Sequence, residues 1–315
     1  MTRLLDPLTD FGFKRLFGTE PNKAFLIALL NALLPEGYRI ADLEFRNPEW
    51  VGKTDLDRKA FFDLFCIGVD GTRFIVELQR ARQRYFRDRC LWYSTFPIQE
   101  QAIRGREWDF RLAPVIVVAI LDFLLDEPAA PEPGDYLHVV QLKNQRGEVF
   151  SDKYMQVYLE LPRFRKEAGA LATEADKWIY FLRNAGNLSG RPAGLSGEMF
   201  DDIFEEAKVA LLRPEERDEY EGELRRSRDL LNAYRTAKED GLTAGRAEGR
   251  AEGRTEGLAE GMERGAAQKE REVREAVALD TLRAGLGLDT AVKLSRLTVA
   301  DVRTLASENG IDLGA

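Results

Sequence analysis

Two carboxylates in otherwise apolar segments are the residues whose chemistry this sequence makes easiest to interpret. Asp63 follows Phe61 and Phe62, and Glu77 follows the apolar run 74–76, so each acidic side chain interrupts a segment typical of a buried strand. An ionised carboxylate in such a segment costs several kcal/mol unless a cation or hydrogen-bond donors meet it. The pair therefore predicts one shared divalent cation, or else two side chains that point to solvent at the rim of a sheet.

The register of the hairpin between these segments decides which of the two holds. A two-residue loop would place the carboxylates on opposite faces of the sheet. A three-residue loop over 69–71, with Gly71 in the left-handed conformation, places Asp63 directly across from Glu77 and puts Gln79 on the same face. The paired Cβ atoms would then be roughly 4.5 to 5.5 Å apart, close enough for both carboxylates to bind one Mg²⁺, with Mn²⁺ as a substitute.

A basic and aromatic segment follows the second strand. Residues 80–89 contain five arginines and one aspartate, although the whole protein has a net charge of -8. Such a segment suits a phosphate backbone, which it would position without reading base sequence; the alternative is a solvated charged face of a helix packed on the sheet. The residues that we expect to contact nucleic acid are Lys14, Arg80, Arg82, Arg84, Arg87 and Arg89.

The elements that must position these residues follow from hydrophobic spacing and from turn residues. Asp10 would cap the first helix or add a metal ligand from it. The order of elements predicts an α/β or α+β domain that ends near residue 200. In chain order we expect helices over 10–17 and 22–34, the hairpin over 61–79, a helical stretch to about Trp108, strands over 114–121, 136–142 and 155–161, and helices from about Glu174.

At these residues the sequence resembles the Rpn-type recombination-promoting nucleases and transposases of the PD-(D/E)XK superfamily. The resemblance covers roughly residues 6–200 and depends on Asp63, thirteen intervening residues and then Glu77-Leu78-Gln79, preceded by the segment 10–14. It implies a restriction-endonuclease-like core, with a central mixed sheet flanked by helices and a long helical C-terminal extension. It also implies a Mg²⁺-dependent DNA endonuclease that hydrolyses phosphodiester bonds in recombination or transposition.

The resemblance assigns roles residue by residue. Asp63 is the motif aspartate, Glu77 is the acidic position, and Gln79 stands where most of the superfamily has lysine, so these three are the expected catalytic residues. Asp63, Glu77 and the Leu78 carbonyl would hold the metal. Gln79 can orient water but carries no charge. A second metal ion, Lys14 or one of the arginines after Gln79 would have to supply the missing positive charge.

The uncharged Gln79 leaves a second function open. The chain would then be a catalytically weak, nuclease-like protein that binds DNA or assembles with partners. Lysine at position 79 would activate such a scaffold, whereas in a working enzyme it would change the rate or the metal preference only modestly.

The C-terminal part has a different composition. Glycine recurs every fourth residue from Gly241 to Gly265, among charges of both signs. On a helix a period of four drifts by about 40° per repeat, so the glycines spiral round the axis. We expect a charged helical linker, with coiled-coil association into a homo-oligomer as the alternative.

Thr298 and Asp301 form a capping-box pattern that begins a last helix, within a plain helical hairpin or a helix-turn-helix-like unit. The expected division is a nuclease-like domain over 1–200, a helical connection over 201–240, a linker over 241–275 and a small helical unit over 276–315.

Composition excludes several other classes of protein. Two cysteines and one histidine are too few for a disulfide framework, a thiolate zinc site or histidine-based catalysis. The longest apolar stretch, 113–121, is far below the roughly 18 to 20 residues that span a bilayer. We expect a cytoplasmic protein that binds DNA and no membrane. Because 54 acidic residues outnumber 46 basic ones, DNA must be bound by a local basic patch.

Overall fold

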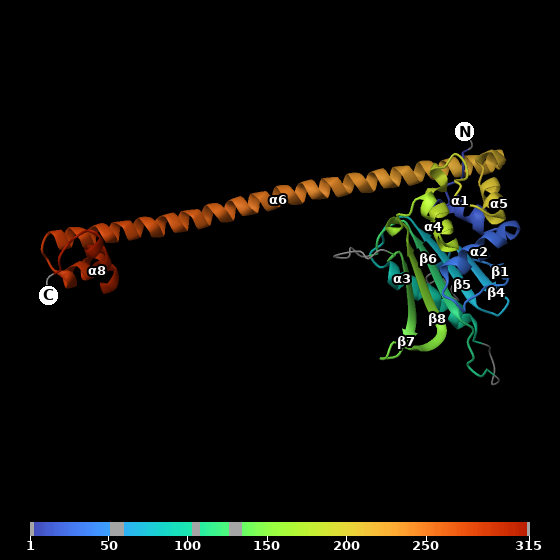
Figure 1. The fold of residues 1–315 in the computed structure, drawn as a ribbon, viewed down its shortest axis with the longest axis horizontal. Helices are drawn as coiled ribbons and strands as arrows, with labels where there is room; N and C mark the ends of the chain where they lie inside the picture. The colour runs from blue at the N-terminus through green and yellow to red at the C-terminus, as the bar shows by residue number, and fades with distance from the viewer. Residues whose placement is uncertain (1–2, 51–59, 103–107, 126–133, 314–315) are drawn as a thin grey trace. The chain divides into compact units, whose positions relative to one another are not determined.

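The computed structural model describes residues 3–50, 60–102, 108–125 and 134–313 of the chain (Figure 1). The chain divides into two compact units, Met1–Asp229 and Leu230–Ala315, which are described separately below. Among the described residues, no helix combines the length and the apolar composition that crossing a membrane requires.

A mixed six-stranded sheet forms the centre of the first unit, in the order β1-β4-β5-β6-β8-β7. The strands β5, β6 and β8 run parallel to one another, and the outer pairs are antiparallel. All seven residues of β6 are buried, as expected for the middle of a sheet that is covered on both faces. The strands are β1 Leu43–Arg46, β4 Leu64–Gly68, β5 Arg73–Gln79, β6 Val115–Leu121, β7 Leu137–Lys143 and β8 Val149–Glu160, and β2 Glu49–Trp50 pairs separately with β3 Ala60–Phe61.

Helices cover both faces of this sheet, because alternate strand residues are apolar on each side (Figure 1). Cys66 and its same-face neighbours pack in one core with α1 Asp10–Phe17, α2 Lys23–Leu33, α4 Glu174–Asn184 and α5 Glu198–Glu206. Phe65 and its neighbours pack in the other core, against α3 Phe86–Glu100. This mixed sheet with flanking helices is the restriction-endonuclease-like α/β core that the sequence predicts.

Two predicted elements have different limits in the structure. The helix after the hairpin begins only at Phe86 and ends at Glu100, so residues 80–85 form a loop. This loop carries the chain from the end of β5 to the helix that covers one face of the sheet. The strand expected over 155–161 begins earlier, at Val149. Its first six residues are exposed or half-buried, so they lack the apolar pattern by which the buried half is recognised.

The core of the first unit continues beyond residue 200. Phe200, Phe204, Tyr220 and Leu224 all belong to the core that covers α1, α2 and α4. Tyr220 and Leu224 lie in the first turns of α6, which runs from Pro214 to Arg283. The beginning of the long helix is therefore part of the packing that supports the sheet.

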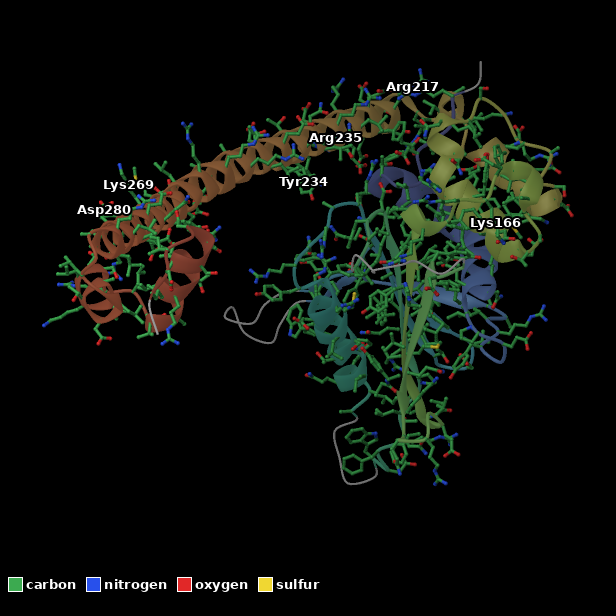
Figure 2. The ribbon with its side chains drawn as sticks, turned by 60° about the vertical axis from the view of Figure 1, so that its left-hand side comes forward. Lys166, Arg217, Tyr234, Arg235, Lys269 and Asp280 are labelled. Carbon is green, nitrogen blue, oxygen red and sulfur yellow. The ribbon has the colours of Figure 1, made fainter. Side chains whose placement is uncertain are left out.

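The second unit consists of the rest of α6 with α7 Leu288–Ser295 and α8 Val299–Glu308. Thr298 and Asp301 form the predicted capping box, and a small core around Ala278, Ala291 and Val302 holds the helices together. The glycine repeat is helical throughout, and charged side chains such as Arg235 and Lys269 project from α6 (Figure 2).

Candidate active site

The loop between β4 and β5 has the three-residue form that the carboxylate pairing requires. Gly71 has a φ of +84°, and the Gly68 N–H donates to the Thr72 carbonyl over 2.8 Å. Leu64 is paired with Val76, so one further step along the hairpin puts Asp63 across from Glu77. The predicted register is confirmed, and the two carboxylates share one face of the sheet.

Asp63 immediately precedes β4, where that strand stops covering the edge of β5. Its Oδ2 accepts a hydrogen bond from the Leu78 N–H at 2.6 Å. The N–H and carbonyl of one strand residue face the same edge, so the Leu78 carbonyl also faces this edge of β5. The Gln79 carbonyl, by contrast, accepts from the Asp122 N–H on the β6 side. The backbone of Leu78 is therefore free of the sheet ladder next to the Asp63 carboxylate.

Glu77 is almost completely buried, with 4% of its surface exposed, and its Oε1 has no hydrogen-bond partner. Burial and the negative charge of Asp63 raise the pKa of Glu77 to about 8, although Arg89 opposes the shift. Burial also raises the pKa of Asp63, against the hydrogen bond from Leu78. A buried and a half-buried carboxylate therefore lie together with too little positive charge between them.

The donor set fits one hard divalent cation. Glu77 Oε1 is a buried oxygen without a partner, and both side chains offer only oxygen. Within the described residues no group of three or more His, Cys, Asp or Glu side chains could hold a metal, so further ligands would be the Leu78 carbonyl and water. Mg²⁺ is commonly held in this way, by one or two carboxylates and several waters.

Asp10 and Lys14 of α1 lie near enough to influence this pair electrostatically. Asp10 raises and Lys14 lowers the pKa of Asp63. Lys14 Nζ lies 2.7 Å from the Asp10 carboxylate, so the two charges largely satisfy each other. Asp10 does not cap α1; the side chain of Thr9 does, accepting from the Gly12 N–H at 3.0 Å. The capping role expected for Asp10 is wrong because α1 begins one residue earlier than that role requires, which makes Asp10 the first residue of the helix and Thr9 its cap.

Comparison with known protein families agrees with this geometry. A family model described as "PD-(D/E)XK nuclease family transposase" matches residues 7–237. The chain belongs to this family. The match confirms the resemblance drawn from the hairpin motif and gives the chain a function related to nucleases and transposases. No curated protein and no solved structure matches it.

Members of the PD-(D/E)XK nuclease family generally use divalent metal ions, and their usual substrate is DNA. In this member, the glutamine of the Glu-Leu-Gln motif is held at both ends. Gln79 Nε2 donates to the Ala81 carbonyl at 3.0 Å, and its Oε1 accepts from Arg89 Nη2 at 2.7 Å. The same Arg89 atom lies 3.4 Å from Glu77 Oε2. One arginine of α3 therefore joins the side chains at both motif positions.

The other predicted DNA-binding residues of this family member lie in different surroundings. Arg80 contacts Asp6, Asp122 and Ser227, so its charge is largely balanced within the fold. Three of the arginines between residues 80 and 89 line a pocket of about 270 Å³, together with aromatic side chains. Its lining includes Arg82, Arg84, Tyr85, Arg87 and Phe123. The six basic residues thus divide into a pocket lining, two ion-paired side chains and Arg89 beside the motif.

Sequence reasoning missed two acidic residues around the site. Asp122 directly follows β6 and lies 3.8 Å from Arg80, and burial raises the pKa of its carboxyl. A polar residue at the carboxyl end of a buried parallel strand is a signal that could have found it. Glu223 accepts hydrogen bonds from the backbone N–H groups of Asp10 and Phe11. No local pattern indicates this contact, because more than 200 residues separate the partners.

Proposed function

We propose that this protein is a Mg²⁺-dependent endodeoxyribonuclease that hydrolyses DNA phosphodiester bonds during recombination or transposition. The observation that supports it most directly is the pairing of Asp63 with Glu77 at the edge of β5, with the Glu77 Oε1 atom left without a partner. Family membership supports the reaction class, and the local excess of negative charge supports the cation.

Hydrolysis of a phosphodiester forms a bond between a water oxygen and phosphorus and breaks one bond from phosphorus to a sugar oxygen. The water loses a proton and the leaving oxygen gains one, with no oxidation or reduction. Asp63, Glu77 and the Leu78 carbonyl would hold the cation, and the Asp63–Leu78 hydrogen bond keeps the first carboxylate in place. When bound, the cation would stabilise charge on the phosphate and acidify a water molecule.

The basic pocket gives the DNA strand a place beside this site. Gln83 lines the pocket and also accepts a hydrogen bond from Arg89 at 2.5 Å, so the pocket adjoins the motif. Arginines can pair with phosphate oxygens, and Tyr85, which is largely exposed, offers a ring on which a base can stack. Such contacts position the backbone of DNA without specifying its sequence.

The test is cleavage of supercoiled plasmid DNA in the presence of Mg²⁺ or Mn²⁺. We expect Asp63→Asn and Glu77→Gln each to lower the cleavage rate by about 100-fold or more, because each removes one charged ligand. Glu44→Gln, a change to an exposed residue of β1, is the matched control and should cut at the wild-type rate. Equal cutting by all four proteins would reject the site.

A catalytically weak, DNA-binding or assembly function is the second candidate, and the uncharged Gln79 favours it. In that case the wild type would bind DNA without cutting it, and Gln79→Lys would create cleavage. If the protein is instead a working endonuclease, Gln79→Lys only changes the rate at which the wild type already cleaves DNA.

A further inference from the structure

Arg89 occupies a more constrained position than a residue that only attracts DNA to the surface. Its side chain is 25% exposed. Its neighbours Phe86 and Cys90 belong to the core between α3 and the sheet. The guanidinium carbon lies 4.8 Å from the centre of the Phe86 ring and 5.5 Å from that of Tyr93. Together with Gln83 and Gln79, these rings hold the guanidinium in one orientation.

The charges around Arg89 indicate that its guanidinium lies where negative charge gathers. Asp63 and Glu77 bring two negative charges, and a phosphate would add another. Lys14 is paired with Asp10, whereas Arg89 lies in contact with Glu77 and Gln79 themselves. The Arg89 Nε atom is buried and has no hydrogen-bond partner, as is also true of Glu77 Oε1. A buried donor and a buried acceptor at the same site are therefore both without a partner.

An arginine at this position is suited to bind a phosphate. Its planar guanidinium presents several N–H donors in a fixed fork, which matches phosphate oxygens. We propose that Arg89 contacts the phosphate to be cleaved and supplies the positive charge that Gln79 lacks, while Gln79 positions the guanidinium. This inference rests on the proposed nuclease function and adds a catalytic residue to it. Gln79 then acts through Arg89 rather than as a substitute for a charged side chain.

A purely structural role makes a different prediction. If Arg89 only held Glu77 and Gln79 in place within the fold, its loss would disturb the metal ligands, and metal binding and cleavage would fall together. If it acts on the phosphate, its removal leaves the carboxylates free to attract a cation at least as strongly, while cleavage falls. Metal affinity and cleavage rate therefore change in opposite directions, or independently, in the proposed role.

The experiment compares the wild type with Arg89→Gln, Arg89→Ala and the double variant Arg89→Ala/Gln79→Lys. Arg146→Ala, on the exposed turn between β7 and β8, is the control. We expect the single variants to cut plasmid DNA about 100-fold more slowly, with Mg²⁺ affinity by isothermal titration equal to or tighter than that of the wild type. The added lysine should recover about tenfold of the lost rate, because it restores a positive charge at the motif.

Two outcomes would overturn the inference. The first is cutting by Arg89→Ala at a rate within about threefold of the wild-type rate. The second is that both single variants lose cutting and Mg²⁺ binding together, and that the double variant recovers no cutting. If the wild type itself does not cut, the proposed function fails, and fluorescence anisotropy with duplex DNA in Mg²⁺ decides the phosphate contact. Arg89→Gln must then bind DNA about fivefold or more weakly than Arg146→Ala, and equal affinity would reject the contact.

Discussion

Glu223 accepts a hydrogen bond from the Phe11 N–H at 2.7 Å, across 212 positions of the chain. It also accepts from the neighbouring Asp10 N–H, so one carboxylate near the beginning of α6 satisfies two free amides at the N-terminus of α1. A negative charge at this end of a helix is favourable. The contact joins the long helix to the segment that carries Asp10 and Lys14.

Replacement of this carboxylate tests the contact. We expect Glu223→Ala to lower the free energy of unfolding of the first unit by about 1 to 2 kcal/mol, and Glu223→Gln by about half as much, because glutamine keeps an acceptor but loses the charge. Urea denaturation followed by tryptophan fluorescence measures both. Glu221→Gln changes a neighbouring carboxylate that pairs with exposed Arg3 and should have a smaller effect. An equal loss in the two glutamine variants would show that the helix terminus is not the cause.

Metal binding should relieve the charge at Glu77. The raised pKa of Glu77, about 8, means that this group's contribution to stability is complete below the ordinary value of 4.5 and is lost as pH rises through about 8. Without metal, the wild type should therefore lose stability between pH 5 and pH 8 relative to Glu77→Gln, on the order of 2 kcal/mol. Calorimetric Tm values at the two pH values measure the difference.

Mg²⁺ should remove that difference in the wild type. A ligand at about 100 times its Kd stabilises by about 2.7 kcal/mol, and the glutamine variant should gain much less. Equal stabilisation of both proteins by Mg²⁺ would place the cation elsewhere.

Asp176 should stabilise the first unit in the opposite pH range. It is fully buried at the start of α4 and accepts from Lys166 Nζ at 2.7 Å and from the Ala172 N–H at 2.9 Å (Lys166 is labelled in Figure 2). Burial alone would raise the pKa of this carboxyl, but the hydrogen bonds from Lys166, Ala172 and Thr173 lower it below 3.8. Its contribution is therefore present above about pH 4 and is lost as pH falls further.

We expect Asp176→Asn to cost about 1 to 3 kcal/mol at pH 7, and the difference from the wild type to shrink below pH 4. Urea midpoints at pH 7 and pH 3.5 test this. A difference that stays constant between these pH values would mean that the charge of Asp176 does not contribute.

The glycines of α6 provide a test of association. A Cβ atom added at Gly249 or Gly253 would meet nothing within 4 Å in the chain, so alanine should fit. Each Gly→Ala change should stabilise the helix by about 0.5 to 1 kcal/mol, seen as increased ellipticity at raised temperature. Weakened self-association of Gly249→Ala/Gly253→Ala in sedimentation velocity would instead show that these glycines pack against a second copy.

The sequence by itself determined the local features of this protein. The three-residue loop with Gly71 set the register of one hairpin, and a one-residue change would have moved Glu77 to the other face. The limits of α4 and the capping box at Thr298 likewise depend on residues a few positions apart. Such features are predictable because the groups that interact are neighbours in the chain.

Only the tertiary structure decided which distant groups complete the site. Five arginines between 80 and 89 look alike in sequence, yet Arg89 alone among them contacts both Glu77 and Gln79 in the described structure. The difference arises because residues 80–85 form a loop, so α3 begins at Phe86 and presents Arg89 to the sheet. The approach of Glu223 to α1 depends in the same way on how α6 packs, which no local spacing encodes.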